Sequence, residues 1–157
     1  MRFKRQVIIA VLLFCAMKSQ FYPTVVPSES MVPTLLVNDY IFYSKTDKVE
    51  EGDVILLQLD GKKAFLTKRV IAMGEGKTVE VKYDGVYVDN IKRKDEIPLE
   101  EQGYIMEKIT LKEGELFVMG DNRTNSADGR VFGPIKESNV KGKLFLRIPF
   151  GKIIEEE

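Results

Sequence analysis

Pro27-Ser28-Glu29-Ser30-Met31-Val32-Pro33-Thr34 is the stretch around which this chain is organised. Each proline fixes its own φ and pushes the preceding residue toward extended geometry. The hydroxyls of Ser28 and Ser30 therefore lie on a stiff, non-helical backbone, which suits the presentation of a nucleophile. A serine alone is most often a solvated loop residue, so this hypothesis requires a base to accept its proton.

The chain of 157 residues contains no histidine. This absence excludes Ser-His-Asp and Cys-His catalytic arrangements and every zinc site with histidine ligands. A serine nucleophile would have to transfer its proton to another group. A lysine held in its neutral form is the best alternative.

Lys68 lies in an apolar segment, Phe65-Leu66-Thr67-Lys68-Arg69-Val70-Ile71-Ala72. In a strand, Lys68 would share one face with Leu66, Val70 and Ala72. Burial there disfavours the ammonium, and lowering the lysine pKa from about 10.4 to near 8 requires roughly 3 kcal/mol. Lys68 alone could equally be an edge-strand lysine that prevents sheet pairing. Together with Ser30, it predicts the Ser-Lys form of acyl transfer.

A third polar stretch is Gly120-Asp121-Asn122-Arg123-Thr124-Asn125-Ser126-Ala127-Asp128-Gly129-Arg130. Taken alone, it is ordinary turn material. A calcium loop is excluded because Arg123 occupies a position that requires an acidic or amide ligand. Two ion pairs are expected to make this loop a support for the base, Asp121 with Arg69 and Asp128 with Arg130.

The segments Pro27 to Thr34, Lys68 to Ile71 and Gly120 to Arg130 resemble, in the same order, the three signature motifs of type I (leader) signal peptidases. With the amino-terminal apolar segment, the resemblance spans nearly the whole chain. It implies a membrane-anchored serine endopeptidase that removes signal peptides from exported pre-proteins. In that reading Ser30 is the nucleophile and Lys68 the general base.

The resemblance also implies supporting roles. The Ser28 hydroxyl and the Ser30 backbone N–H would form the oxyanion hole, and Ser126 would hydrogen-bond and orient the lysine. The family's substrates carry small side chains at the first and third positions before the cut, and Val70 and Ile71 are expected to line shallow pockets for them. The supporting residues are Ser126, Asp121, Arg69, Asp128 and Arg130. No metal or organic cofactor is implied.

The sequence departs from the family pattern at several turn positions. Ala72-Met73-Gly74-Glu75-Gly76 replaces a usual Gly-x-Pro-Gly-Asp turn, Thr124 replaces an Asp, and Gly129 replaces a Ser. None of these residues is an expected proton carrier. The altered turn keeps open a second hypothesis, a catalytically inactive, membrane-tethered β domain that binds exported chains.

The amino terminus has an apolar run of 11 residues, Val7 to Met17, preceded by Arg2, Lys4 and Arg5. Crossing a bilayer takes about 20 residues. A helix from Gln6 to Tyr22 would reach about 25 Å at 1.5 Å per residue. The basic residues predict a single pass with the amino terminus in the cytoplasm of a bacterium. We therefore assign residues 1–23 to a cytoplasmic tip and membrane anchor and residues 24–157 to an extracytoplasmic catalytic β domain.

Two alternatives for this segment are less favoured. A cleaved signal peptide typically has an apolar region this short, but Lys18 and Gln20 lie where small residues are needed. A lipoprotein signal would require a small residue before Cys15, where the chain has Phe14. A retained anchor, and hence contact with a lipid bilayer, is the prediction.

Beyond Thr34, short strands separated by turns predict a mainly β fold, an antiparallel sheet domain following one anchor helix. Asp60-Gly61 and Asp84-Gly85 are hairpin signals, and Ile91 to Gln102 has the composition of a charged loop or partial helix. The expected strands include Ile41 to Tyr43, Val54 to Leu59, the Lys68 segment, Thr78 to Lys82, Val86 to Val88, Leu116 to Met119 and Leu144 to Ile148.

Composition excludes some other classes. The 24 basic and 24 acidic residues cancel, so no nucleic-acid partner is indicated. A self-cleaving Ser-Lys protease of the phage-repressor type would normally have a DNA-binding module before its serine, whereas 29 residues, largely apolar, precede Ser30. The sequence leaves the oligomeric state and the preferred pre-proteins open.

Overall fold

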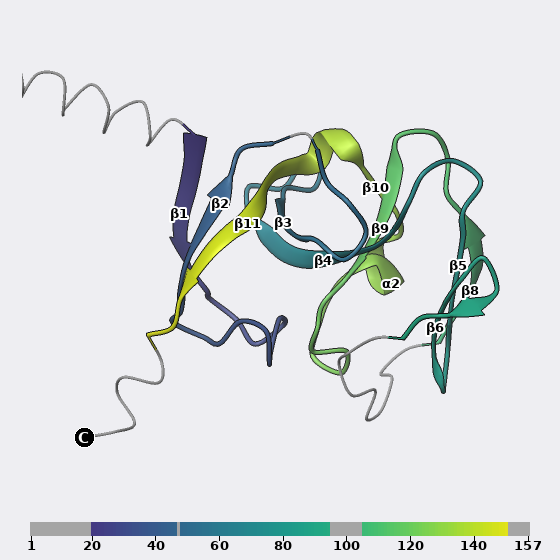
Figure 1. The fold of residues 1–157 in the computed structure, drawn as a ribbon. Helices are drawn as coiled ribbons and strands as arrows, with labels where there is room; N and C mark the ends of the chain where they lie inside the picture. Colours follow the sequence, from purple (N-terminus) through teal and green to yellow (C-terminus); the bar gives the residue numbers. More distant parts are fainter. Residues whose placement is uncertain (1–19, 47, 95–104, 151–157) are drawn as a thin grey trace, which may run out of the picture.

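The computed structural model describes residues 20–46, 48–94 and 105–150 (Figure 1). Within these residues the chain forms two antiparallel sheets, one of seven strands and one of four. The prediction of a mainly β, antiparallel fold is therefore confirmed. The apolar run Val7 to Met17 lies outside the described residues. Among those that are described, no helix has the length and apolar character needed to cross a membrane.

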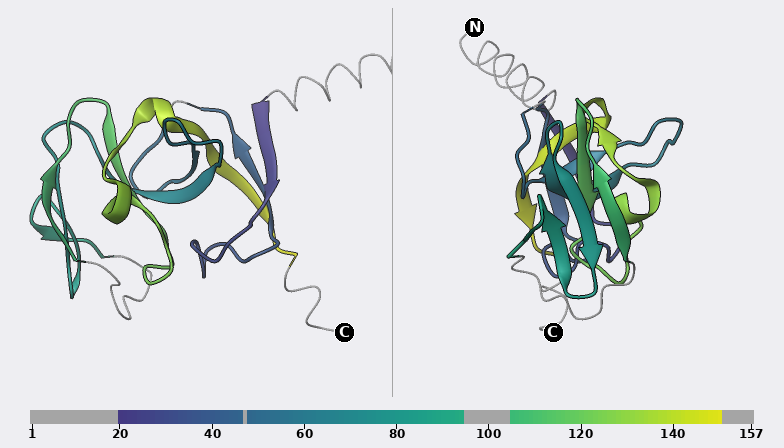
Figure 2. Two further views of the ribbon diagram at one scale, coloured as in Figure 1. Left: turned by 180° about the vertical axis from the view of Figure 1, so that it is seen from behind. Right: turned by 90° about the vertical axis from the view of Figure 1, so that its right-hand side faces the viewer.

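The large sheet contains, in spatial order, β1 (Phe21–Val25), β2 (Tyr40–Ser44), β11 (Val140–Ile148), β3 (Val54–Leu57), β4 (Leu66–Met73), β9 (Glu115–Met119) and β10 (Ile135–Lys136). The small sheet contains β7 (Ile91–Lys92), β6 (Gly85–Val88), β5 (Thr78–Lys82) and β8 (Met106–Thr110). A single helical turn, α2 (Gly129–Phe132), begins within the last two residues of the third motif, and a 3-10 turn (Glu137–Asn139) precedes β11. Figure 2 shows in its right-hand view the small sheet in front of the large one.

The strands expected from sequence are present with shifted ends, and the Asp84-Gly85 hairpin joins β5 to β6. The expectation of a helix that reaches Tyr22 was wrong. Phe21 and Tyr22, assigned to the end of a helix, belong to β1, which pairs along its length with β2. Of the segment Ile91 to Gln102, Ile91 and Lys92 form β7, and residues 95–102 lie outside the described part of the chain.

Strand β3 lies between β11 and β4, and its four residues are all buried. Their side chains alternate between two core clusters. Val54 and Leu56 pack in one cluster, whereas Ile55 and Leu57 pack in another on the opposite face. This explains the nearly unbroken apolar sequence, because a strand covered on both faces has no solvent side.

The Ser30 loop (residues 26–39) connects β1 to β2. Its base is closed by hydrogen bonds from Val26 N to Asp39 O and from Asn38 N to Val26 O, both 3.0 Å. Met31 and Leu35 are each 1% exposed and pack against β2 and β3 in the same cluster as Tyr43. Fully burying such a side chain stabilises a fold by about 1.5–3 kcal/mol. The Ser30 loop is therefore held both by the apolar packing of Met31 and Leu35 and by the backbone hydrogen bonds between Val26, Asn38 and Asp39.

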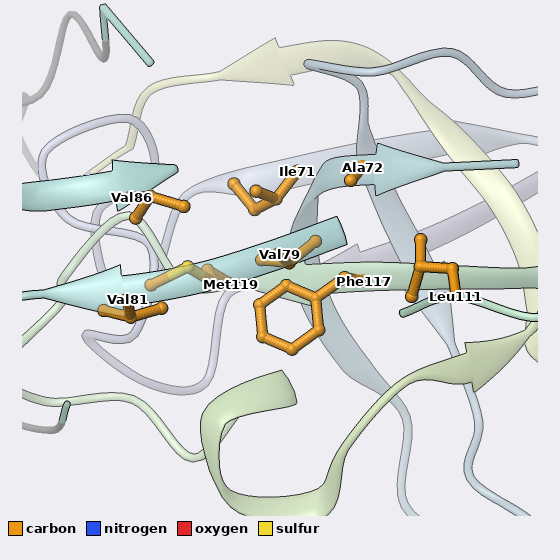
Figure 3. Packing of buried hydrophobic residues seen from close by; sticks show 8 residues of the cluster. All are labelled: Ile71, Ala72, Val79, Val81, Val86, Leu111, Phe117 and Met119. Atoms are coloured by element: carbon orange, nitrogen blue, oxygen red, sulfur yellow. The ribbon is translucent and has the colours of Figure 1, made fainter. Parts of the chain in front are cut away.

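The small sheet packs on β4 and β9 through a third apolar cluster (Figure 3). Ile71 and Ala72 of β4 meet Val79 and Val81 of β5 there. The β4–β9 register shifts between Val70 and Ala72, and this irregularity breaks the expected alternation along β4. Ala72 consequently packs in the same cluster as Ile71, whereas the sequence predicted that it would share a face with Lys68.

Candidate active site

The first and second motifs meet at two side chains. The hydroxyl Oγ of Ser30 and Nζ of Lys68 are hydrogen-bonded at 2.9 Å. Lys68 Nζ also donates to the Thr67 carbonyl at 2.9 Å, and the Ser28 hydroxyl lies 3.4 Å from Ser30 Oγ. The serine and lysine are 38 residues apart in sequence. The Ser30 loop and β4 thus bring a hydroxyl and an amine within proton-transfer distance.

Lys68 is 3% exposed, although it carries an ionisable group. Burial lowers its pKa to about 8, because the ammonium loses its hydration. The negative charges of Asp128 and Asp121 oppose this effect, and the positive charge of Arg130 adds to it. The amine is therefore substantially neutral in mildly alkaline solution and can accept a proton.

The third motif folds around Asp128. Its carboxylate accepts hydrogen bonds from Gly120 N at 2.8 Å and from two nitrogens of the Arg130 side chain at 2.9 Å each. Both side chains of this pair are 0% exposed. Burial raises the pKa of Asp128, but the hydrogen bonds from Arg130 and Gly120 outweigh it, so the pKa lies below its ordinary value. The pair thus fixes the end of β9 to the start of α2.

The second expected ion pair, between Arg69 and Asp121, is also present. Arg69 donates to both carboxylate oxygens of Asp121, at 2.8 and 2.6 Å. The same guanidinium donates to the Gly52 carbonyl at 2.7 Å and to Thr34 Oγ1 at 3.3 Å. Because Arg69 follows Lys68 in β4, this network ties the lysine strand both to the third motif and to the Ser30 loop.

The third motif also contacts Ser30 directly. Asn122 N donates to the Ser30 carbonyl at 3.1 Å. A Cβ at Gly120 would lie 2.5 Å from the same carbonyl oxygen and would collide with the Ser126 hydroxyl. Only glycine therefore permits this approach of β9 to the nucleophile loop.

The hydrogen bond expected from Ser126 to the lysine is not made. The Ser126 hydroxyl is buried and has no hydrogen-bond partner among the described residues. It packs beside Gly120 instead. The partners of Lys68 Nζ are instead the Ser30 hydroxyl and the Thr67 carbonyl.

A cavity of about 150 Å³ opens beside the Ser30–Lys68 pair. One wall comes from β1 and the start of the Ser30 loop, and the other from β4 and the residue before it. The cavity is lined by Thr24, Val25, Val26, Pro27, Ser28, Ser30, Met31, Ile41, Leu56, Phe65, Leu66, Thr67 and Lys68. Apart from the two serines, the lysine and the two threonines, these side chains are apolar.

Val70 and Ile71, which the sequence analysis assigned to substrate pockets, do not line this cavity. Both are 0% exposed. Val70 packs with the central strands of the large sheet, and Ile71 packs against the small sheet. Residues that precede Lys68, among them Leu66 and Thr67, form the wall instead.

Within the described part of the chain, no group of three or more His, Cys, Asp or Glu side chains is arranged to hold a metal ion. The chemistry that the described site offers is proton transfer between a hydroxyl and an amine, next to an apolar cavity.

Comparison with known proteins identifies the family. The sequence model described as "Signal peptidase, peptidase S26" matches residues 1–149. This chain belongs to the signal peptidase family. Membership makes it a serine peptidase, and the resemblance to type I signal peptidases is confirmed.

Individual relatives agree with the family assignment. The chain is 36% identical over 156 residues to a probable signal peptidase I-1 of Synechocystis sp., covering 89% of this chain and 79% of that protein. It is 34% identical over 167 residues to a signal peptidase I of Bacillus licheniformis, covering 95% and 89% respectively. A solved signal peptidase I structure from Enterococcus faecalis V583 superposes with a TM-score of 0.54 at 27% identity, covering 62% of this chain and 97% of that one.

Sequence reasoning missed several residues that shape this signal peptidase site. Asn122 contacts Ser30 through its backbone, and Asp39 and Arg147 hold the far end of the Ser30 loop. Nothing in the local sequence marks them, because their partners lie 92 to 108 residues away along the chain or are backbone atoms.

Proposed function

We propose that this signal peptidase cleaves the signal peptides of exported pre-proteins by a Ser-Lys dyad, with Ser30 as nucleophile and Lys68 as general base. The observation that carries the proposal is the 2.9 Å separation between Ser30 Oγ and a buried Lys68 Nζ. Family membership supports the substrate class, since the relatives are named signal peptidases.

The first half of the reaction begins with neutral Lys68. Its lone pair accepts the Ser30 hydroxyl proton while Ser30 Oγ attacks the carbonyl carbon of the scissile peptide bond. The tetrahedral intermediate collapses when the resulting ammonium returns a proton to the leaving nitrogen. The products of this half-reaction are an acyl-enzyme on Ser30 and the new amino terminus of the mature protein.

The developing oxyanion needs hydrogen-bond donors that are already in place. In the proposal these are the Ser30 backbone N–H and the Ser28 hydroxyl, which lies 3.4 Å from Ser30 Oγ. The contact from Asn122 N to the Ser30 carbonyl fixes the peptide plane between Ser30 and Met31, next to the plane that carries the Ser30 N–H. Asp121, Arg69, Asp128 and Arg130 act as supports rather than as proton carriers.

In the second half, Lys68 deprotonates a water molecule, which attacks the acyl ester. The second tetrahedral intermediate then collapses: the Ser30 Oγ–carbon bond breaks, the ammonium returns its proton to Ser30 Oγ, and the signal peptide leaves with a new carboxylate. The same amine thus serves both steps. It remains competent because burial holds its pKa near 8.

The cavity limits the substrate. A cavity of about 150 Å³ accepts a group up to roughly the size of benzene, so it admits an aliphatic side chain. We assign the residues just before the scissile bond to this cavity, against Val26, Met31 and Leu66. This assignment gives no role to Val70 or Ile71, which do not line the cavity.

The proposed location is the outer face of a bacterial cytoplasmic membrane, with the segment before β1 as a single-pass anchor; Phe21 to Pro23, which the sequence assigned to the anchor, belong to β1. It rests on the basic residues before the apolar run Val7 to Met17. Protease treatment of intact cells and of inverted vesicles tests this topology. Degradation of residues 24–157 only in intact cells stripped of their wall supports it, and degradation only in inverted vesicles contradicts it.

The dyad is tested with the full chain in detergent and a purified pre-protein. Ser30→Ala and Lys68→Ala should each abolish cleavage, whereas Lys63→Ala, an exposed lysine outside the cavity lining, should cleave normally. Ser28→Ala should lower kcat by about 10²–10³-fold, the effect of removing one oxyanion-hole donor. Cleavage by folded Ser30→Ala or Lys68→Ala enzyme at the wild-type rate would refute the dyad.

A further inference from the structure

The carboxyl-terminal part of β11 reaches the Ser30 loop through Arg147. This residue lies in register with Ile41 of β2. Its Nε donates to Asp39 Oδ2 at 2.6 Å, and its Nη1 donates to the Thr34 carbonyl at 2.8 Å. One guanidinium therefore bonds two separate points of the loop that carries the nucleophile.

Asp39, the first partner of Arg147, is 0% exposed. Its carboxylate also accepts hydrogen bonds from Leu36 N at 2.8 Å and from Phe150 N at 3.2 Å. Burial raises the pKa of Asp39, but the hydrogen bonds from Leu36, Arg147 and Phe150 outweigh it and keep the pKa below its ordinary value. The aspartate is therefore charged when the enzyme works, and Arg147 compensates that charge at the end of the loop.

Thr34, the second partner, is held from two sides. Its carbonyl accepts from Arg147, and its hydroxyl accepts from Arg69, the residue after Lys68. Thr34 follows Ser30 by four residues, and Leu35 N bonds Met31 O at 2.8 Å across that interval. The backbone from Ser30 to Thr34 is thus a short, hydrogen-bonded unit whose far end rests on two arginines.

We infer that Arg147 is a positioning residue, which fixes Ser30 relative to Lys68 by holding Thr34 and Asp39. The inference rests on the proposed Ser-Lys mechanism and adds a residue that belongs to none of the three motifs. Arginine suits this role because its planar fork presents donors to two acceptors at once, whereas a lysine presents a single charged centre.

The expected consequence concerns rate rather than substrate affinity. Proton transfer depends on the 2.9 Å contact, and a displacement of about 1 Å in a reacting group can cost on the order of 10²-fold in rate. Arg147 does not line the cavity, and the wall formed by Leu66, Thr67 and Lys68 belongs to β4 rather than to the Ser30 loop, so KM should change less than kcat. The environment of Lys68 is also retained, so the acid limb of the pH–rate profile should keep its midpoint.

The test compares Arg147→Met and Arg147→Lys in the full, detergent-solubilised enzyme. The matched control is Lys143→Met, which removes an ion pair with Asp53 (2.8 Å) from the same strand. Each variant is assayed well below its own thermal midpoint. We expect kcat to fall about 100-fold in Arg147→Met and about 10-fold in Arg147→Lys, with KM within threefold of wild type and no change in Lys143→Met.

Two results would overturn the inference. One is a folded Arg147→Lys enzyme with kcat within twofold of wild type, and this variant decides the matter if Arg147→Met does not fold. The other is an equal loss in Lys143→Met, which would show a general dependence on β11. Ser30→Ala is assayed in parallel: if it keeps activity, the proposed dyad fails, whereas an inactive Ser30→Ala beside fully active Arg147 variants refutes only the role of Arg147.

Discussion

A buried amine is the most consequential single residue in this protein. Lys68 pairs with no carboxylate in the described structure; its Nζ contacts a hydroxyl and a carbonyl. Asp121 and Asp128, the negative charges that affect it, are each committed to an arginine. Burial is therefore the largest influence on the pKa of Lys68, and this pKa falls instead of rising as it would in an ion pair.

The activity should depend on the neutral form of Lys68. Because its pKa lies at about 8, kcat/KM for pre-protein cleavage should rise about tenfold per pH unit below that value and level off above it. Initial rates measured from pH 6 to 10 at constant ionic strength test this. A midpoint near 6 or near 10.5 would show that a different group, or an unperturbed lysine, controls the reaction.

Replacing the lysine should stabilise the fold. Between pH 8 and 10.5 the unfolded chain binds a proton that the folded chain does not, so wild-type stability rises with pH over that window. Below pH 8 both states carry the charged lysine, and burying that charge lowers the free energy of unfolding by about 3 kcal/mol, at about 1.36 kcal/mol per pKa unit. Lys68→Met should therefore be more stable than wild type at pH 7, with a difference that shrinks toward pH 10.5. Urea unfolding at both pH values measures it; a difference independent of pH would contradict this account.

At the scale of elements, the site lies where the Ser30 loop contacts the end of β9. β9 ends at Met119, and Gly120 then passes directly against the Ser30 carbonyl. The third motif turns back through the Asp128–Arg130 pair into α2. Two elements that meet without side chains between them transmit small displacements directly to the nucleophile.

Gly120→Ala should consequently inactivate the enzyme more than it destabilises it. The new Cβ would lie 2.5 Å from the Ser30 carbonyl oxygen, so the loop must move. Overpacking of this kind costs about 1–3 kcal/mol, while kcat should fall at least 100-fold.

Gly142→Ala is the matched control, because its Cβ would lie 2.6 Å from the Ser44 carbonyl, in the packing of β11 on β2. We expect a similar loss of stability with activity retained. Thermal melts and cleavage assays on both variants measure these effects, and an active Gly120→Ala enzyme would show that Ser30 tolerates the displacement.

On the scale of the whole molecule, a polar junction reinforces the apolar contact between the two sheets. Arg93, which follows β7, donates to the Ile71 carbonyl of β4, at the point where the β4–β9 register shifts. Glu51 accepts from Met73 N at 3.3 Å and from Lys77 Nζ at 2.6 Å, and lies 3.8 Å from Arg93. The carbonyl exposed by the irregularity in β4 is thus satisfied by the small sheet.

Arg93→Met should loosen the small sheet without affecting the catalytic residues. Losing a charged hydrogen bond to a buried carbonyl costs about 1.5–3 kcal/mol. Amide hydrogen exchange should accelerate in β5 and β6 but not in β3, with kcat reduced no more than severalfold. Lys92→Met, which removes the exposed pair with Asp84, is the control and should leave exchange unchanged. Equal acceleration in all strands would mean that the two sheets unfold as one unit.

The sequence predicted those features whose cause is local or whose chemistry is restrictive. Continuous apolar residues predicted β3, and the Asp84-Gly85 turn predicted the β5–β6 hairpin. The absence of histidine indicated a lysine as the base, and hence Lys68. The wall of the cavity was not predictable, because it depends on the curvature that brings β1 opposite β4. The irregularity between Val70 and Ala72 was equally invisible, since strand alternation alone assumes a regular ladder.

Strand β1 enters the large sheet through five residue pairs with β2, beginning at Phe21–Ser44 and ending at Val25–Tyr40. The Ser30 loop follows only after the last of these pairs. A force applied to the chain before Phe21 must therefore separate all of β1 from β2 before it displaces Ser30. The pairing of β1 with β2 thus keeps the Ser30 hydroxyl in place when a force acts on the amino-terminal end of the domain.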